Sequence, residues 1–161
     1  LRTYTIIELL LQTGMRIGEL SRLAFDDVDL DDNKITIREF SSYPSRTIEI
    51  NPVLKKALTS YLNNPESRRS NSEFFFSTRT GNQLLIRNIR SAINATYKRT
   101  GIKDASINDL RNTFILYQLE NGLKLEKLAS TVGHKKISTT ENYLDFIESR
   151  PNKITTKLIP L

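Results

Sequence analysis

The stretch TYTIIELLLQTGMRIGEL, residues 3–20, sets the architecture at the start of the chain. Residues 3–12 are apolar on nearly all sides over a length that suits a buried helix, and the Thr-Gly pair that follows supplies its stop. A second short helix is expected at about residues 16–24. Arg16 therefore stands directly after a glycine-ended helix.

Downstream of this helix pair the pattern changes from a helical to a strand period. Residues 26–32 contain five aspartates and are expected to form a turn region. Residues 35–38 and 46–50 alternate apolar and polar side chains, which predicts two half-buried strands. Residues 41–45 lie between them and predict a hairpin turn.

Helix start and stop signals divide the rest of the chain. Asn51 before Pro52 is a good helix start, and Ser106 with Asp109 resembles a capping box. The further helices are expected, in order, from Asn51 to Leu62, over 86–99, from Ser106 to Gly122, over 123–132, and over about 139–149 behind an S-x-x-E box at Ser138. A polar loop over 63–72 and a basic tail over 150–161 complete the chain. The fold class is therefore α+β, mainly helical, with a small antiparallel sheet.

Composition excludes several classes of protein. The chain has 161 residues and a mass of 18.5 kDa, with 38% hydrophobic and 26% charged residues, as expected of one globular domain. No apolar run is long enough to span a bilayer, so we expect no membrane partner. The absence of cysteine fits a reducing compartment, here the cytoplasm. Because the chain starts at Leu1 without a secretory signal, we expect an excised domain.

The charge points to a polyanionic partner. There are 24 Lys+Arg against 18 Asp+Glu, a net charge of +6, and five of the acids crowd into the predicted turn, so the remaining surface is strongly basic. Phosphate backbones are the obvious partner for such a surface, although solubility alone would also explain it. The candidate DNA-binding residues lie on the basic face of the helix over 86–99 and after the lone histidine: Arg87, Arg90, Lys98, Arg99, Lys135 and Lys136.

The aspartates and glycines do not form a recognisable metal or nucleotide site. Asp27, Asp29 and Asp31 match the first odd positions of an EF-hand loop, but Asp32 occupies the glycine position and Arg38 the position of the bidentate glutamate. A solvated turn is the favoured interpretation. No Walker lysine accompanies the glycines near Arg16. We therefore expect no metal and no cofactor.

Four polar side chains near helix ends remain as candidates for chemistry: Arg16, Arg111, His134 and Tyr143. Two guanidinium groups can clamp the oxygens of one phosphate, and a tyrosine hydroxyl can attack its phosphorus. Each residue also has a plainer explanation. A tyrosine in an amphipathic helix is usually a core residue, a histidine after glycine often caps a helix, and Arg16 can form an ion pair with Glu19.

Taken in order, the motifs resemble one family. They are T-G-x-R-x-x-E-L at residues 13–20, x-x-L-R-x-T-F at residues 108–114, G-H at residues 133–134 and T-T-x-x-Y at residues 139–143. This series is similar to the catalytic domain of the tyrosine recombinases, the phage-integrase family. The resemblance covers nearly the whole chain. It implies one catalytic domain over residues 1–161, in which 150–161 form a C-terminal tail.

The resemblance implies site-specific DNA recombination or integration through a 3′-phosphotyrosyl intermediate, without metal or ATP. It implies the catalytic residues Arg16, Asn108, Arg111, His134 and Tyr143, with Tyr143 as the nucleophile. It further implies double-stranded DNA as partner, a tetramer on paired sites, a monomer without DNA, and association with the nucleoid of a prokaryotic cell. Family members generally carry an N-terminal DNA-binding domain that is missing from this sequence, and their C-terminal segment docks on a neighbouring protomer.

Two positions depart from the family pattern. The family's usual turn lysine, a general acid, aligns with Ser41, and its usual His or Lys three residues before the second arginine is Asn108. Losing one general acid typically costs a factor of about 10² to 10⁴ in rate. A slow enzyme, a lysine supplied from elsewhere, and a degenerate DNA-binding remnant all stay open, as does a type IB topoisomerase-like enzyme.

Overall fold

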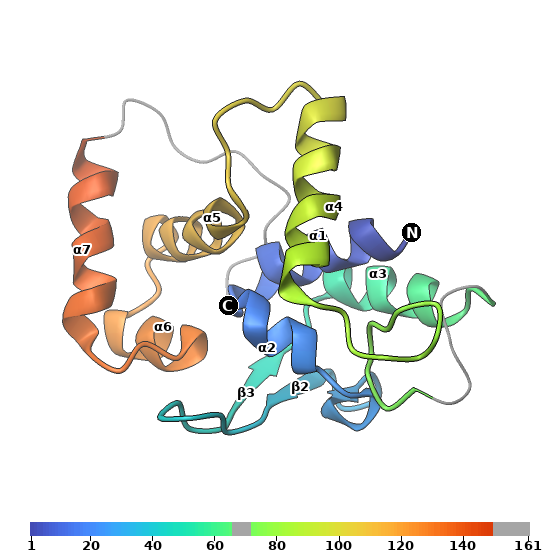
Figure 1. Ribbon diagram of the computed structural model, residues 1–161. Coiled ribbons are helices and arrows are strands. Elements are labelled where there is room, and N and C mark those ends of the chain that lie inside the picture. Colours follow the sequence, from blue (N-terminus) through green and yellow to red (C-terminus); the bar gives the residue numbers. More distant parts are fainter. Residues whose placement is uncertain (66–71, 150–161) are drawn as a thin grey trace.

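The computed structural model describes residues 1–65 and 72–149. Seven α-helices and three strands lie in these residues (Figure 1). The helices are α1 (Arg2–Thr13), α2 (Ile17–Arg22), α3 (Pro52–Leu62), α4 (Ile86–Arg99), α5 (Ile107–Glu120), α6 (Leu125–Val132) and α7 (Ile137–Glu148). The mainly helical α+β architecture predicted from the sequence is confirmed. In the described residues, none of the helices has the length and apolarity that a bilayer crossing requires.

The strands form one antiparallel sheet in the order β1 (Val28–Asp29), β2 (Lys34–Ile37) and β3 (Arg46–Glu49). Ile35 lies opposite Ile48, and both side chains are buried, because alternate residues of each strand face the core. The predicted hairpin is confirmed, with a tight turn closed by a bridge between Phe40 and Tyr43. This hairpin reaches beyond the sheet toward α6 (Figure 1).

The buried apolar side chains form two clusters. The larger joins α1, α2, the sheet, α3, α4 and the start of α5, and its largest fully buried members are Tyr61, Phe75 and Phe76. The smaller consists of Phe114, Ile115, Leu128 and Val132 from α5 and α6, with Tyr143 of α7 packed against it. In Figure 1, α6 and α7 stand to the left of the larger body, and α5 connects the two.

Two predicted elements need correction. Val28–Asp29, which we expected to be turn, pairs with β2 as a third strand, although Asp29 still caps the following turn by accepting from the backbone of Asp31 and Asp32. Helix α7 begins at Ile137 rather than Thr139, so Ser138 lies inside the helix and the S-x-x-E box is not its cap. The extended residue that precedes the helix is Lys136.

The other boundaries lie close to prediction. Helix α4 spans the predicted residues, Asn51 caps α3 by accepting from the Leu54 backbone, and Asp109 accepts from both the backbone and the hydroxyl of Ser106 at the start of α5. Helix α2 is shorter than predicted and ends at Arg22. Most of the predicted loop over 63–72 and the whole tail over 150–161 lie outside the described residues.

Candidate active site

Arg16 is presented by the turn between α1 and α2. Gly14 ends α1 in the left-handed conformation, with φ 61°, and Arg16 follows in an extended conformation as the N-cap of α2. The Glu19 carboxylate accepts from the Arg16 backbone at 2.7 Å. The Arg16 guanidinium then reaches across to α6, where it donates to the carbonyl oxygens of Val132 at 3.2 Å and Gly133 at 2.6 Å.

Arg111, on α5, converges on the same place. Its guanidinium donates to the carbonyl of Gly14 at the end of α1 and to the carbonyl of Val132 at 2.9 Å. The two arginines predicted from the sequence therefore share one acceptor, the Val132 oxygen. Each guanidinium has five N–H groups, more than its partners among the described residues use. The remaining N–H groups can bind the oxygens of one phosphate.

A third arginine holds this arrangement in place. Arg46, the first residue of β3, donates both terminal nitrogens to Glu19 at 2.8 Å each, and its Nε to the Thr131 carbonyl at 2.7 Å. The Arg46 and Glu19 side chains are 9% and 7% exposed. Burial alone would raise the pKa of Glu19, but the hydrogen bonds from Arg46 and from the Arg16 backbone lower it below its ordinary value. Glu19 therefore stays ionised.

The cluster carries more positive than negative charge. Among the described residues, three guanidinium groups surround the single carboxylate of Glu19. Burial, followed by repulsion from Arg16, lowers the pKa of Arg111 to about 10. Arg111 is thus still a cation at neutral pH, but a desolvated one. Such a site favours an anion, because an anion offsets both the desolvation and the repulsion.

His134 follows the glycine that ends α6 and faces the same cluster. Its Nδ1 lies 2.8 Å from the buried hydroxyl of Thr140 on α7, and its ring stacks on Tyr143 with centroids 6.3 Å apart. Burial, and then the charges of Arg111, Arg16 and Arg46, lower its pKa to about 4. The imidazole is therefore neutral at pH 7. With the Thr140 hydroxyl as donor to Nδ1, the ring proton lies on Nε2 and can be donated to an anion.

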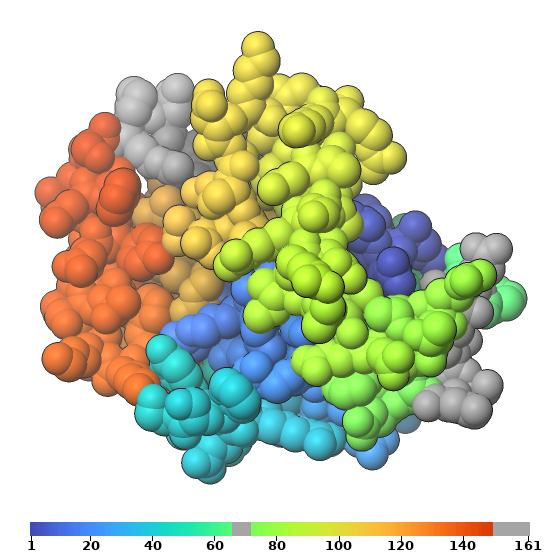
Figure 2. All heavy atoms as spheres, viewed as in Figure 1, coloured from blue at the N-terminus to red at the C-terminus, as the bar shows by residue number. Residues whose placement is uncertain are grey.

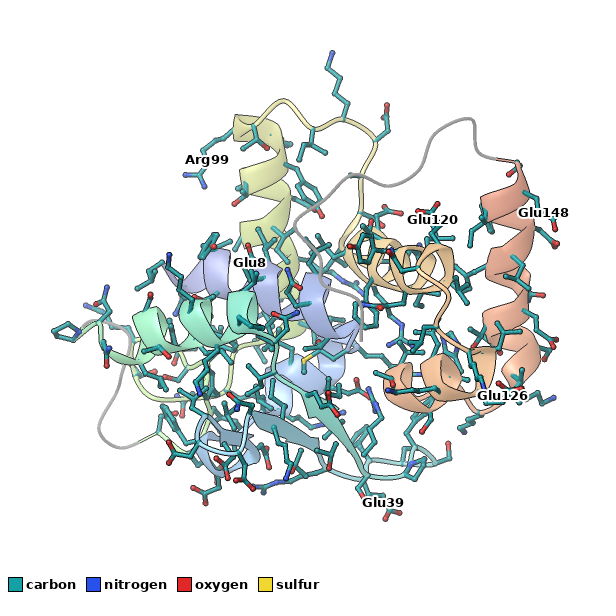
Figure 3. All side chains as sticks on the ribbon, turned by 180° about the vertical axis from the view of Figure 1, so that it is seen from behind. Glu8, Glu39, Arg99, Glu120, Glu126 and Glu148 are labelled. Atoms are coloured by element: carbon teal, nitrogen blue, oxygen red, sulfur yellow. The ribbon has the colours of Figure 1, made fainter. Side chains whose placement is uncertain are left out.

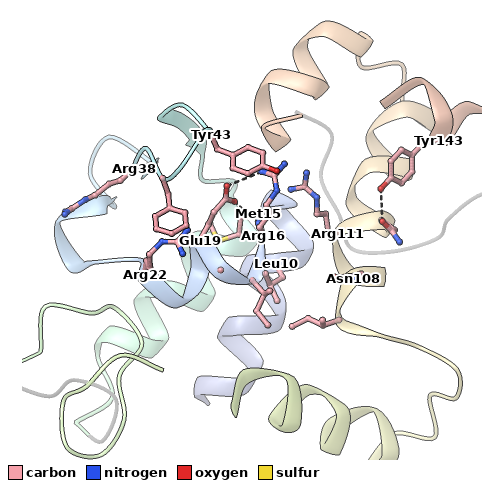
Figure 4. Close-up of a pocket in the computed structure, with 15 residues that line it drawn as sticks. Leu10, Met15, Arg16, Glu19, Arg22, Arg38, Tyr43, Asn108, Arg111 and Tyr143 are labelled. Atoms are coloured by element: carbon pink, nitrogen blue, oxygen red, sulfur yellow. Dashed lines mark hydrogen bonds and ion pairs between the residues drawn. The ribbon is translucent and has the colours of Figure 1, made fainter. Parts of the chain in front are cut away.

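Tyr143 is half-buried on α7 and points toward α5. Its hydroxyl donates to the side-chain oxygen of Asn112 at 2.9 Å (Figure 4). Tyr143 lines the same cavity as Arg16 and Arg111, a hollow of about 590 Å³. Asn108 also lines this cavity and is exposed. The structure therefore brings Arg16, Asn108, Arg111 and Tyr143 around one hollow, and His134 lies next to it against the Tyr143 ring. Asn112 holds the tyrosine hydroxyl.

The β2–β3 hairpin forms one wall of the cavity. At its tip Ser41 has a positive φ of 56°, and the Tyr43 ring lies 4.3 Å from the Arg16 guanidinium carbon. On the same hairpin the Phe40 ring lies 3.6 Å from the guanidinium carbon of Arg22. In Figure 2 the atoms of the α1–α2 region are recessed between this hairpin, α6, α7 and α4.

The six candidate DNA-binding residues are all exposed. Arg87 and Arg90 lie on the first half of α4, whose start contacts α2 next to the cavity. Lys98 and Arg99 lie at its far end, and Arg99 points away from the rest of the molecule (Figure 3). Lys135 and Lys136 connect α6 to α7 beside the hairpin. The structure thus places Arg87 and Arg90 on the part of α4 nearest the cavity and Lys135 against the hairpin wall, and it separates Lys98 and Arg99 from them.

Sequence reasoning missed several partners of these residues. Arg46 was noted only as part of a strand, and Asn112 and Thr140 only as motif positions. Each acts through a contact distant in sequence, such as Arg46 with Glu19 or Tyr143 with Asn112. The one local signal was the spacing of Arg16 and Glu19, which do pair at 3.2 Å. Among the described residues, no three acidic, cysteine or histidine side chains cluster as metal ligands would.

Comparison with known proteins identifies similar chains. The model of the phage integrase family matches residues 1–150. The tyrosine recombinase XerC of Staphylococcus aureus (strain JH9) is 29% identical over 156 residues, which cover 96% of this chain and 52% of the relative. The chain thus spans about half the length of the curated relatives it matches.

Solved structures share the fold. The crystal structure of XerA recombinase superposes with a TM-score of 0.81 at 28% identity, over 94% of this chain and 59% of that one. The XerH site-specific recombinase, solved bound to its palindromic difH substrate in a post-cleavage complex, gives a TM-score of 0.77 at 19% identity, over 90% of this chain and 42% of that one. At that identity, the likeness to XerH concerns the fold alone.

Proposed function

The chain belongs to the phage integrase family, and from this membership and the geometry of its cavity we propose that it is the catalytic domain of a site-specific tyrosine recombinase. It cleaves and rejoins double-stranded DNA. The observation that carries the proposal is the convergence of Arg16 and Arg111 on the Val132 oxygen, in a cavity that Tyr143 also lines.

In the proposed reaction, the scissile phosphate binds to the free N–H groups of Arg16 and Arg111. Both guanidinium groups are oriented beforehand by backbone carbonyls at the ends of α1 and α6. They stabilise the negative charge that spreads over the non-bridging oxygens in the transition state. The neutral ring of His134 donates a further hydrogen bond to one of these oxygens.

Tyr143 is the proposed nucleophile. Its hydroxyl leaves Asn112 and attacks the phosphorus, which forms a 3′-phosphotyrosyl bond and releases a 5′-hydroxyl. Attack by a 5′-hydroxyl of the partner strand reverses the step and completes strand exchange. The bond energy is conserved in the phosphotyrosine, so no nucleotide cofactor is required.

The wider assembly is also a proposal. XerH and the integrase of the transposon Tn1549 were solved bound to DNA, which supports DNA as the partner of this chain. We place its action on DNA in the cytoplasm of a prokaryotic cell, as a tetramer on paired sites and a monomer without DNA. Light scattering with and without a bound duplex tests the two states.

Covalent capture tests the central proposal without knowledge of the target site. The chain is incubated with a pool of nicked duplexes of random sequence, so that the fragment released next to the nick diffuses away and the adduct accumulates. Adducts that survive denaturation are recovered and their DNA is sequenced. The wild-type chain is expected to enrich one sequence, and Tyr143→Phe to give no adduct. Tyr117→Phe, on α5 outside the cavity, is the matched control and keeps the adduct.

Other outcomes identify the alternatives. Binding without any adduct indicates a DNA-binding module that does not cleave. Relaxation of a supercoiled plasmid without sequence preference indicates a type IB topoisomerase-like enzyme. An adduct that persists in Tyr143→Phe shows that another residue is the nucleophile.

Within the recombinase proposal, Arg111→Lys is expected to slow adduct formation by about 10² to 10³. The Arg111 guanidinium donates to the Gly14 and Val132 oxygens at once and still has N–H groups for the phosphate, and a single ammonium cannot replace this planar arrangement of donors.

A further inference from the structure

The amine of Lys135 lies at the tip of the β2–β3 hairpin. Its Nζ is hydrogen-bonded to the Ser42 hydroxyl and lies 4.6 Å from the centre of the Tyr43 ring. The Arg16 guanidinium carbon lies 4.3 Å from the centre of the same ring. Tyr43 lines the same cavity as Arg16 and Arg111. Its contacts with Lys135 therefore hold the lysine at the edge of that cavity.

The backbone also brings Lys135 close to the reacting groups. It directly follows His134, and both residues line a second cavity of about 390 Å³ between the hairpin and the end of α6. The Lys135 side chain is exposed, and its four-carbon chain is flexible, so the amine can turn from the hairpin toward a bound phosphate.

The proposed cleavage requires a proton donor. An alkoxide is a poor leaving group, and a general acid that protonates it typically contributes a factor of about 10² to 10⁴ in rate. Asn108 and Asn112 can donate hydrogen bonds but do not give up a proton near neutral pH. His134 is already neutral at pH 7, and Arg111 remains a cation that its carbonyl partners hold in place.

We propose that Lys135 is the general acid that protonates the leaving 5′-oxygen, a role that rests on the function proposed above. The bond between Tyr143 Oη and phosphorus forms while the bond between phosphorus and O5′ breaks. The electron pair of the broken bond goes to O5′, which takes a proton from Lys135 Nζ and leaves a neutral amine. The phenol proton of Tyr143 is released to water. In religation, the attacking 5′-hydroxyl gives its proton to the amine as the bond between phosphorus and O5′ forms. The bond between phosphorus and Tyr143 Oη breaks, and the phenolate takes a proton from water.

A sulfur-substituted substrate tests this role directly. The sequence enriched by covalent capture is made with the bridging 5′-oxygen of the scissile phosphate replaced by sulfur, which leaves without protonation because a thiol is far more acidic than an alcohol. We expect Lys135→Ala to cleave the oxygen substrate about 10² to 10⁴ times more slowly than the wild type. On the sulfur substrate its rate returns to near that of the wild type.

Two variants separate proton donation from charge. Lys135→Arg keeps the positive charge and the hairpin contacts but is a poor acid, so it is expected to behave like Lys135→Ala on both substrates. Lys136→Ala removes the neighbouring positive charge, and any loss through weaker DNA binding is expected to be equal on both substrates. The ratio of the oxygen and sulfur rates is therefore the decisive quantity.

Several results would overturn the proposal. Lys135→Ala at the wild-type rate on the oxygen substrate would do so, as would an equal loss on both substrates, which indicates binding alone. If Tyr43→Phe were rescued by sulfur and Lys135→Ala were not, the Tyr43 hydroxyl would be the acid. If the wild type formed no adduct with either substrate, the proposed function itself would fail and this role with it.

Discussion

At the scale of single residues, His134 reports on the charge of the cavity. It is the only histidine in the chain, so its imidazole gives one set of NMR signals. Burial and three neighbouring arginines lower its pKa to about 4, and we expect a titration midpoint near that value rather than near 6.5. A bound phosphate group should raise the midpoint, because its charge offsets the arginines. A midpoint near 6.5 in the free protein would show that the arginines do not face the ring.

The same shift predicts how stability depends on pH. Because the pKa of His134 is lower in the folded protein, the unfolded chain binds the proton more readily between about pH 4 and 6.5. The contribution of this neutral histidine is complete above about pH 6.5 and is lost as the pH falls toward 4. After allowance for solvent screening of this half-exposed group, the loss is on the order of 1 kcal/mol.

Urea denaturation of the wild type and of His134→Gln at pH 7 and pH 5 measures this contribution. The two proteins contain the same carboxylates, so the difference between their two pH responses isolates the histidine. Equal responses would contradict the prediction.

Glu19 is the second residue with a measurable role. It accepts from both terminal nitrogens of Arg46 and from Arg16, in a pair that is almost fully buried. Glu19→Gln removes the negative charge and leaves a buried guanidinium without its counterion, which costs about 3 kcal/mol. Chemical denaturation measures the loss. Asp32→Asn is the matched control, because its ion pair with Lys34 is exposed, and we expect it to cost less than about 0.5 kcal/mol.

At the scale of elements, the glycine that ends α1 positions both arginines of the site. The turn at Gly14 presents Arg16, and the Gly14 carbonyl accepts from Arg111. Gly14 has a φ of 61°, and a Cβ at this position would lie 2.4 Å from Cδ1 of the buried Phe114 ring. Gly14→Ala is therefore expected to cost about 3 kcal/mol or more, from backbone strain and from the clash. Gly101→Ala is the control, since its φ of 73° gives the same strain with no atom within 4 Å, and about 1 kcal/mol is expected. Thermal unfolding of the two variants compares these costs, and equal losses would argue against the close contact with Phe114.

Element boundaries were predictable where the signal was local. The apolar stripe of α4 and the Asn51 cap of α3 each depend on residues within one or two turns, and both were located from sequence. The start of α7 was not, because spacing alone does not tell which residue takes the extended backbone that a cap needs. Lys136 takes it here, and Ser138 is helical. Strand β1 was missed because two residues carry no pattern and its pairing with β2 is set by tertiary contact.

The candidate site shows the same division. Motif order singled out Arg16, Arg111, His134 and Tyr143; the structure places the two arginines and the tyrosine around one cavity and His134 next to the tyrosine. Motif order could not reveal that Arg46 locks Glu19, because that contact spans 27 positions. Nor could it show that Lys135 contacts Ser42, because that contact spans 93 positions. Ser42 is next to Ser41, which stands where the family usually has a lysine.

At the scale of the whole molecule, the cavity lies where the two apolar clusters meet. Arg16 and Arg46 come from elements of the larger cluster and donate to carbonyls at the end of α6, which belongs to the smaller one. The negative end of the α6 dipole strengthens these bonds. Arg16, which is proposed to bind the phosphate, therefore also helps Arg46 to hold the two clusters together.

The overall charge of +6 gives a last prediction, for the salt dependence of DNA binding. Each phosphate contact contributes about 0.9 to the slope of log affinity against log salt. Arg87 and Arg90 are exposed on α4 beside the cavity, so the double variant Arg87→Gln, Arg90→Gln should lower that slope by up to about 2. Lys56→Gln is the control, because Lys56 is exposed on α3 and α1 lies between α3 and α4 (Figures 1 and 3). Fluorescence anisotropy with one duplex from 50 to 200 mM salt gives both slopes. An unchanged slope in the double variant, or an equal change in Lys56→Gln, would place the DNA on another face.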